Sequence, residues 1–230
     1  MKRKACVRWW AWMAGGLAFT LVLACASNPK TAPGGLTAIN EMTLQGANSF
    51  LDGYSPLAAE GAVQVIIEIP TGTNAKWEVT KPDGLMRWKV KKGKPRVVHY
   101  LSYPGNYGMV PRTLLPEEEG GDGDPLDVLV LGPAVPRGSV MTVRLLGVLR
   151  LLDRGEQDDK LIALPVEGAV MQAGSLEELE QNYPGVRSII ETWFVRYKGP
   201  GKMESQGYGD AAEARAILER AIAAFQKDHP

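Results

Sequence analysis

The segment from Ala62 to Pro70 alternates apolar and polar side chains. Its apolar face consists of Val63, Val65, Ile67 and Ile69, and its polar face includes Gln64 and Glu68. A period of two residues indicates a β-strand, because successive side chains of a strand point to opposite faces of a sheet. Taken alone, the pattern favours a solvent-facing position for the Glu68 carboxylate.

Further short segments with the composition of strands follow, and turn residues separate them. They cover residues 76–79, 86–90, 96–101, 126–131, 140–152 and 161–166. Pro82-Asp83-Gly84 is a typical hairpin turn between two of them. Short strands that follow one another without alternating helices predict an antiparallel barrel or sandwich.

The period changes near the C-terminus, where apolar residues recur at helical spacing. Ser175 and Glu178 have the spacing of a capping box, which marks the start of a helix. Two apolar stripes follow, made of Val186, Ile189, Ile190, Trp193, Phe194 and Tyr197, and of Ala214, Ile217, Leu218, Ala221, Ile222 and Phe225. Strands first and helices last predict an α+β fold, with two C-terminal helices packed on a β core.

The N-terminal residues have the pattern of an export signal. A basic start precedes the apolar run from Trp9 to Ala24, which is short for a membrane span with both flanks. The run closes on Val22-Leu23-Ala24-Cys25, which resembles the lipobox of bacterial lipoproteins. An uncleaved anchor and a plain secreted protein are the alternatives.

We therefore expect three parts: a signal peptide over residues 1–24, a mostly irregular tether over residues 25–60 that carries lipid on Cys25, and a single domain over residues 61–230. This arrangement places the domain on the periplasmic face of a bacterial membrane, held through the lipid anchor only. Ala26 follows the cysteine, and the absence of Asp there favours the outer membrane.

Charge and cysteine content exclude several classes of protein. The chain of 230 residues has 26 basic and 26 acidic side chains, but four of the basic ones lie among the first eight residues. The remainder has 22 basic side chains against 26 acidic ones, so the domain is mildly acidic. It therefore lacks the excess of basic residues that is typical of a nucleic-acid-binding protein. Without Cys6, which belongs to the signal, and Cys25, no thiol remains for a disulfide or a thiolate metal site.

The stretch Gly121-Asp122-Gly123-Asp124-Pro125-Leu126-Asp127 concentrates acidic residues just before the predicted strand 126–131. Three carboxylates this close repel one another unless a positive partner neutralises them. A divalent cation that prefers oxygen ligands is one such partner. A solvated acidic turn is the alternative, because Asp-Gly pairs are ordinary in turns.

From Val63 to about Phe225 the chain resembles family I soluble inorganic pyrophosphatases. The resemblance rests on segments in the family's order: Ile67-Glu68-Ile69-Pro70, Lys76-Trp77-Glu78, Tyr103-Pro104-Gly105-Asn106-Tyr107-Gly108, Asp122 to Asp127, Asp153 through Asp158 to Lys160, and Tyr197-Lys198. It implies a small OB-like barrel of antiparallel or mixed strands, flanked by helices. It also implies hydrolysis of pyrophosphate to two phosphates in a cavity that holds several Mg²⁺ ions.

The resemblance further implies a role for each matching position. Asp122, Asp127, Asp153 and Asp158 are expected as metal ligands, and Asp124 as the general base that acts on a water. Glu68 and Glu78 are expected as outer carboxylates. The expected phosphate-binding set is Lys76, Arg96, Tyr107, Lys160, Tyr197 and Lys198. Carboxylates without histidine or thiolate suit Mg²⁺, and nothing in the pattern calls for His99 or His229.

Some questions stay open at the level of sequence. Arg87 is the alternative to Arg96 as the phosphate arginine, because the chain between Gly84 and Tyr103 is longer than in compact bacterial relatives. The segment 201–209 departs from the family pattern, so assembly into a homo-oligomer is undecided. The alternative to hydrolysis of pyrophosphate is that the protein uses this fold to bind metal and phosphate without catalysis. A variant of the enzymatic function is that the protein also cleaves other phosphoanhydrides.

Overall fold

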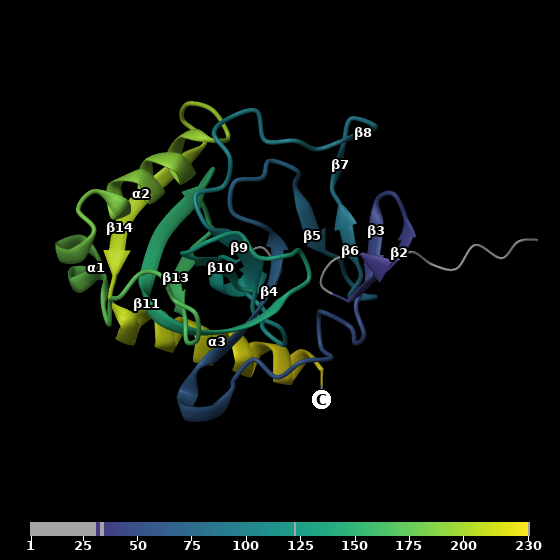
Figure 1. Cartoon of the computed structure of the whole chain (residues 1–230), viewed down its shortest axis with the longest axis horizontal. Helices are drawn as coiled ribbons and strands as arrows, with labels where there is room; N and C mark the ends of the chain where they lie inside the picture. Colours follow the sequence, from purple (N-terminus) through teal and green to yellow (C-terminus); the bar gives the residue numbers. More distant parts are fainter. Residues whose placement is uncertain (1–30, 33–34, 122, 230) are drawn as a thin grey trace, which may run out of the picture.

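The computed structural model describes residues 31–32, 35–121 and 123–229. Its centre is a barrel of β4 (Val63–Ile69), β9 (Asn106–Met109), β10 (Asp127–Val130), β13 (Lys160–Pro165) and β11 (Val140–Asp153). Neighbours pair in the order β11-β13-β10-β9-β4, and β4 pairs back to β11, which closes the barrel. Only the β10–β13 pair is parallel in it. The expected small mixed barrel is confirmed (Figure 1).

The long strand β11 makes closure possible because it pairs with different partners along its length. Its first residues pair with β4 and its middle with β13, and its end pairs with β12 (Glu156–Gln157) and β14 (Met203–Gly209). A register shift lies at Gly147, where a Cβ atom would stand 2.4 Å from the carbonyl oxygen of Gly209. Only glycine fits where the strands approach this closely.

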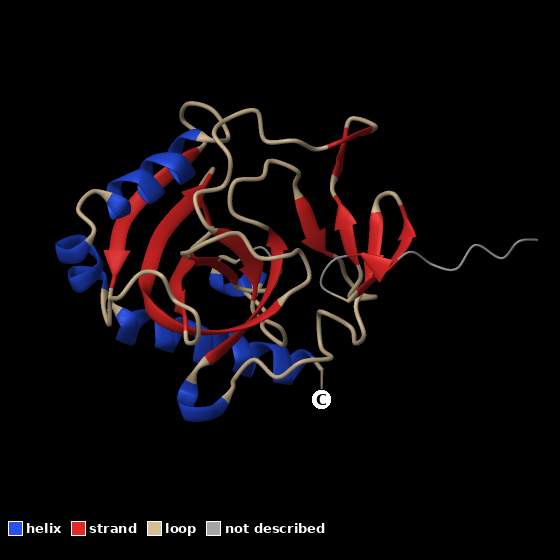
Figure 2. Ribbon diagram, in the orientation of Figure 1, coloured by secondary structure: helices blue, strands red, loops and turns tan. Residues whose placement is uncertain are grey.

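Three α-helices cover the barrel: α1 (Leu176–Asn182), α2 (Val186–Arg196) and α3 (Ala211–Asp228). The Ser175 hydroxyl accepts a hydrogen bond from the Glu178 N–H, as the capping box predicts. The Asp210 carboxylate caps α3 in the same way. The buried stripe of α3 packs on β11 and shares an apolar cluster with side chains of β4, β10 and β13, while α1 and α2 lie at another side (Figures 1 and 2).

The N-terminal region is more ordered than the sequence suggests. A second sheet has the order β1-β2-β3-β6-β5, made of β1 (Thr31–Ala32), β2 (Leu36–Asn40), β3 (Thr43–Gln45), β6 (Met86–Trp88) and β5 (Trp77–Val79). Within the segment expected to be a mostly irregular tether, these short strands join the sheet, and Leu36 and Phe50 are buried among the side chains of this sheet and the barrel. Residues 1–24 and Cys25 lie outside the described part.

Two further segments differ from the predicted elements. Residues 96–101 form no strand beyond one bridge between Val97 and Ala75, and a two-stranded hairpin of β7 (Val90–Lys91) and β8 (Lys94–Pro95) precedes them. Strand β14 was not predicted. Its sequence is polar and rich in glycine, and its conformation follows from pairing with β11.

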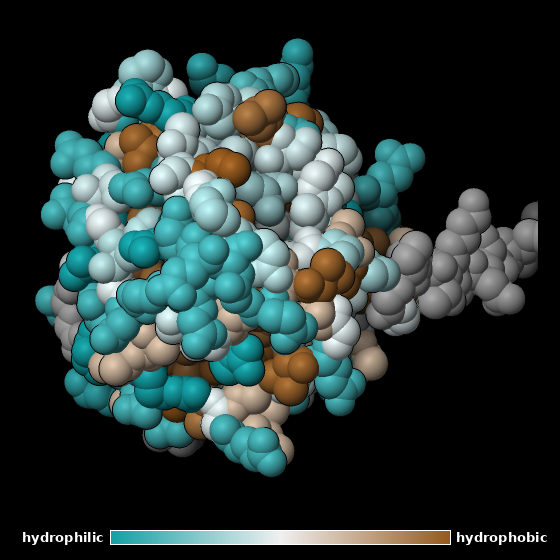
Figure 3. Space-filling view, turned by 60° about the vertical axis from the view of Figure 1, so that its left-hand side comes forward, coloured by the Kyte–Doolittle hydropathy of each residue, from teal (hydrophilic) through white to brown (hydrophobic). Residues whose placement is uncertain are grey.

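The remaining regular elements are two short 3₁₀ helices, η1 (Ala59–Gly61) and η2 (Glu117–Glu119). Among the helices that the structure describes, none has the length and apolar content needed to cross a bilayer. Figure 3 shows a largely hydrophilic face on which apolar side chains form separate small patches.

Candidate active site

A cavity of about 740 Å³ collects most of the residues that the family resemblance singles out. It lies between the β5–β8 region and the C-terminal end of α2. A smaller cavity of about 260 Å³ adjoins it and is lined by Glu68 and Asp127. The predicted residues that line the larger cavity are Lys76, Glu78, Arg96, Tyr107, Asp124, Asp153, Asp158, Tyr197 and Lys198.

Lys160 joins two of the predicted metal ligands. Its ammonium group lies 2.7 Å from Asp127 Oδ2 and also donates to Asp158 Oδ1, although only 1% of its side chain is exposed. Burial by itself lowers the pKa of Lys160, but the charges of Asp127 and Asp158 outweigh burial and raise it. Lys160 is therefore charged and holds the two carboxylates at a fixed separation.

Asp158 also contacts Lys198, which stands at the end of α2. The Lys198 ammonium lies 2.6 Å from Asp153 Oδ2 and 3.3 Å from Asp158 Oδ2. Burial raises the pKa of Asp158, but the charges of Lys160 and Lys198 outweigh burial and lower it. Asp158 is therefore an anion, which is the form that binds a cation.

The donor set fits a hard cation. Asp153 Oδ1 is buried and has no hydrogen-bond partner among the described residues, so one carboxylate oxygen remains for a ligand. The described carboxylates form no group of three or more that is close enough to hold a metal ion by itself, and Asp122, the first of the predicted ligands, lies outside the described part. Asp127, Asp153 and Asp158 supply oxygen ligands only, which suits Mg²⁺.

Asp124 lies on the loop before β10 and faces both cavities. Its carboxylate is 59% exposed and its Oδ1 lies 2.8 Å from the Lys81 ammonium. Lys81 also donates to the Gly123 carbonyl at 2.6 Å. The predicted general base is therefore accessible from the cavity and is contacted by a lysine that the sequence did not single out.

The two outer carboxylates differ in their surroundings. Glu68 is 4% exposed and accepts a hydrogen bond from the Val79 N–H at 2.6 Å, so the solvent-facing position that the alternation suggested is wrong. Burial raises the pKa of Glu68 to about 8, against the opposing charge of Lys76. Glu78 is more accessible and pairs with Lys89 at 2.8 Å.

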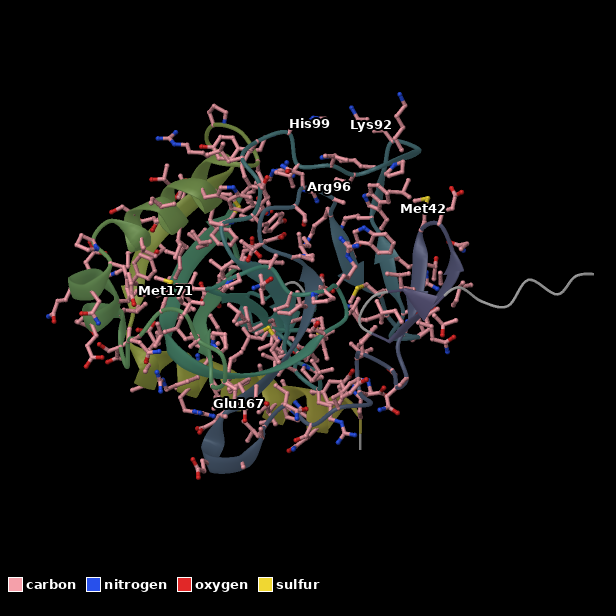
Figure 4. The ribbon with its side chains drawn as sticks, in the orientation of Figure 1. Met42, Lys92, Arg96, His99, Glu167 and Met171 are labelled. Carbon is pink, nitrogen blue, oxygen red and sulfur yellow. The ribbon has the colours of Figure 1, made fainter. Side chains whose placement is uncertain are left out.

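Basic residues face the carboxylates across the cavity. Lys76 lies 4.8 Å above the centre of the Tyr107 ring. Arg96 lies on the connection that crosses above the barrel, near His99, whereas Lys92 stands at the outer tip of the β7–β8 hairpin (Figure 4). Arg87 lines neither cavity and pairs instead with Asp83, so the geometry favours Arg96 over Arg87 as the phosphate arginine.

A cluster of aromatic side chains packs on the α2 side of the larger cavity. Tyr197 stacks on Trp193 at 4.6 Å between ring centres, and Trp193 packs on Tyr103, which in turn contacts Tyr107. Burial raises the pKa of both Tyr103 and Tyr107. Both hydroxyl groups therefore keep their protons at neutral pH, and that of Tyr107, which lines the larger cavity, can donate a hydrogen bond to an anion.

The structure adds basic residues that sequence reasoning missed. Lys81 and Lys89 contact predicted functional carboxylates, and Arg154, Arg196 and Lys202 line the rim of the larger cavity. None of them belongs to a family motif: the Lys81–Asp124 contact joins segments far apart along the chain, and the Lys89–Glu78 contact forms across the β5–β6 hairpin. His99 lies at the rim, and His229 stacks on Phe225 at the end of α3.

Comparisons with known proteins agree with this geometry. The sequence profile described as inorganic pyrophosphatase matches residues 65–226. The inorganic pyrophosphatase of Kluyveromyces lactis is 39% identical over 164 residues, which cover 64% of this chain and 57% of that protein. That of Xanthomonas campestris is 36% identical over 174 residues, which cover 73% of this chain and 92% of that protein. The chain thus spans less than three fifths of the Kluyveromyces relative.

Solved structures show the same fold. The inorganic pyrophosphatase of Schistosoma japonicum superposes with a TM-score of 0.71 at 29% identity, covering 78% of this chain and 71% of that chain. The one from Helicobacter pylori superposes with a TM-score of 0.60 at 34% identity, covering 72% of this chain and 94% of that chain. The barrel with its helices is therefore an arrangement that these proteins share.

Proposed function

The chain belongs to the inorganic pyrophosphatase family, and from that premise we propose that it hydrolyses inorganic pyrophosphate to two phosphates in the presence of Mg²⁺. One observation carries the proposal: a single cavity brings carboxylates from the β10 and β11–β12 regions to face basic and tyrosine side chains from β5, β9 and α2. Pyrophosphate is a small, highly charged anion, and this combination matches it.

The carboxylates on one side account for the metal. Asp122, Asp127, Asp153 and Asp158 would hold Mg²⁺, which when bound supplies charge neutralisation and lowers the pKa of a bound water. Lys160 keeps Asp127 and Asp158 at a fixed separation. Glu68 and Glu78 line the smaller cavity beside Asp127 and are the outer carboxylates of the site.

The basic side accounts for the substrate. Lys76, Arg96 and Lys198 neutralise the phosphate oxygens, while the Tyr107 and Tyr197 hydroxyl groups orient them. Asp124 takes a proton from a water whose oxygen attacks one phosphorus atom. The bond from that phosphorus to the bridging oxygen breaks, and the second phosphate leaves with the electron pair.

Phosphate release from pyrophosphate tests the proposal. The protein that starts at residue 26 is assayed with Mg²⁺ and with a chelator. We expect activity that depends on the metal and falls about 10²–10⁴-fold in Asp124→Asn, the range for loss of a general base. Asp52→Asn, a change at an exposed carboxylate outside both cavities, is the matched control. Full activity in Asp124→Asn would refute the role of Asp124.

The alternative is a protein that binds metal and phosphate without catalysis. It predicts no phosphate release from pyrophosphate with any divalent cation, together with measurable phosphate binding by calorimetry. Asp124, Lys76 and Tyr197 favour the enzyme, because a pure binding protein has no need of a base between its carboxylates and its cations.

We propose, finally, that the protein is a lipoprotein attached through Cys25 to the periplasmic face of a bacterial membrane. The support is the basic start, the apolar run and the Leu23-Ala24-Cys25 ending. Growth with a radioactive fatty acid tests this. Wild type and Cys6→Ala should incorporate label and Cys25→Ala should not, and equal labelling of all three would refute the anchor.

A further inference from the structure

Lys81 contacts the loop that carries Asp124 through two different groups. Its ammonium lies 2.8 Å from Asp124 Oδ1 and 2.6 Å from the carbonyl oxygen of Gly123. One cation thus binds the carboxylate of a residue and the backbone just before that residue. Two contacts on neighbouring groups fix the direction of the Asp124 carboxylate relative to its own main chain.

The turn that carries Lys81 is firmly braced. The backbone N–H of Thr80 donates to the Leu85 carbonyl at 2.8 Å, and that of Gly84 donates to the Thr80 carbonyl at 2.9 Å. Arg87 clamps Asp83 through both carboxylate oxygens. The backbone from which the Lys81 side chain extends is therefore held in place.

Backbone hydrogen bonds to Leu115 hold the loop that carries Asp124. Gly123 N–H donates to the Leu115 carbonyl at 2.8 Å, and Leu115 N–H donates to the Asp124 carbonyl at 3.0 Å. These bonds fix the main chain and leave the direction of the Asp124 side chain to other groups. Lys81, which lies on the turn between β5 and β6, supplies such a group.

Lys81 reaches Asp124 from the smaller cavity and does not line the larger one, where the phosphate-binding residues stand. An ion pair exposed to this extent, 48% and 59% for the two side chains, contributes little to the stability of the fold. We propose that Lys81 is a positioning residue that aims the Asp124 carboxylate at the attacking water. This inference rests on the proposed function of the site.

The test compares Lys81→Met, which keeps length and loses charge, with Lys81→Arg, which keeps charge. Lys94→Met, an exposed lysine on β8 outside both cavities, is the matched control. With pyrophosphate and Mg²⁺ we expect kcat to fall about tenfold in Lys81→Met while KM changes less than about twofold, because a misplaced base affects the transition state more than substrate binding. Lys81→Arg should recover most of kcat.

A second measurement does not depend on activity. Hydrogen exchange of the peptide spanning residues 115–126, in the presence of a chelator, should be faster in Lys81→Met than in wild type and unchanged in Lys94→Met. Equal kcat in Lys81→Met and wild type, or a loss of kcat that arginine does not restore, would overturn the inference, as would unchanged exchange. If wild type does not hydrolyse pyrophosphate, the proposed function fails, and the exchange comparison still decides whether Lys81 holds the loop.

Discussion

The indole N–H of Trp88 donates a hydrogen bond of 2.9 Å to the backbone carbonyl of Arg96. The same carbonyl accepts a second bond, 3.0 Å long, from the N–H of Lys76, and the N–H of Arg96 donates to the Lys89 carbonyl at 2.7 Å. Three basic residues from separate segments are thereby joined through their main chains at one edge of the cavity. Trp88 is the only side chain among these partners, so it can be changed without removing a charge.

Trp88→Phe should weaken the binding of pyrophosphate. Phenylalanine keeps an aromatic ring against Trp77, whose ring centre lies 5.6 Å away, and removes the donor to Arg96. Loss of one hydrogen bond of about 1 kcal/mol allows the Arg96 loop to move, and we expect KM to rise about 3–5-fold with a smaller change in kcat. Steady-state kinetics measure the split. A lower melting temperature with unchanged KM would show that the bond serves only the fold.

Lys160→Met should destabilise the metal-free protein. It removes the cation between Asp127 and Asp158 and leaves two carboxylates facing each other. Breaking a buried ion pair in this way costs about 3–5 kcal/mol. Urea unfolding in a chelator measures the loss, and Mg²⁺ should restore more stability to the variant than to wild type. Lys94→Met serves as control, and equal unfolding free energies in the chelator would contradict the prediction.

The elements that follow a simple period were predictable from sequence. β4 and α3 bury the residues that alternation and helical spacing select, because their burial depends on local periodicity. Strand β14 and the β2–β3 hairpin were not predictable from sequence. Their strand conformation depends on pairing with β11 and β6, which lie elsewhere in the chain. Glu68 shows the same limit, since alternation cannot distinguish a face toward water from a face toward a polar cavity.

The residues of the site divide in a similar way. The family motifs named positions such as Asp158 and Lys198, which the structure brings within 3.3 Å of each other. Lys81 and Lys89 belong to no motif, and only the folded chain places them against Asp124 and Glu78. Such contacts depend on how the strands pair and where the loops between them run. Sequence patterns that extend over only a few residues therefore could not predict these contacts.

Phe50→Ala should show that the N-terminal segment belongs to the domain. The Phe50 ring is 1% exposed and packs in the cluster of Trp77 and Met86, and its N–H donates to the Gly84 carbonyl. Truncation of a buried phenylalanine costs about 3–5 kcal/mol. Ile39→Ala, at a position 51% exposed on β2, should change the unfolding free energy by less than about 0.5 kcal/mol. Similar values for the two variants would mean that the segment does not contribute to the core.

Glu68→Gln should stabilise the protein more as the pH rises. The pKa of Glu68 is about 8 in the fold, because burial raises it from the model-peptide value of 4.5. Between those values the folded state keeps a proton that the unfolded state has lost, so the stability present below pH 4.5 decreases as the pH rises, by at most about 1.4 kcal/mol per pH unit. Glutamine still accepts the Val79 hydrogen bond and does not ionise. Unfolding of both proteins in a chelator between pH 4 and 9 should therefore show a difference that grows up to about pH 8 and then stays constant. A difference that does not vary with pH would mean that Glu68 keeps its charge in the fold.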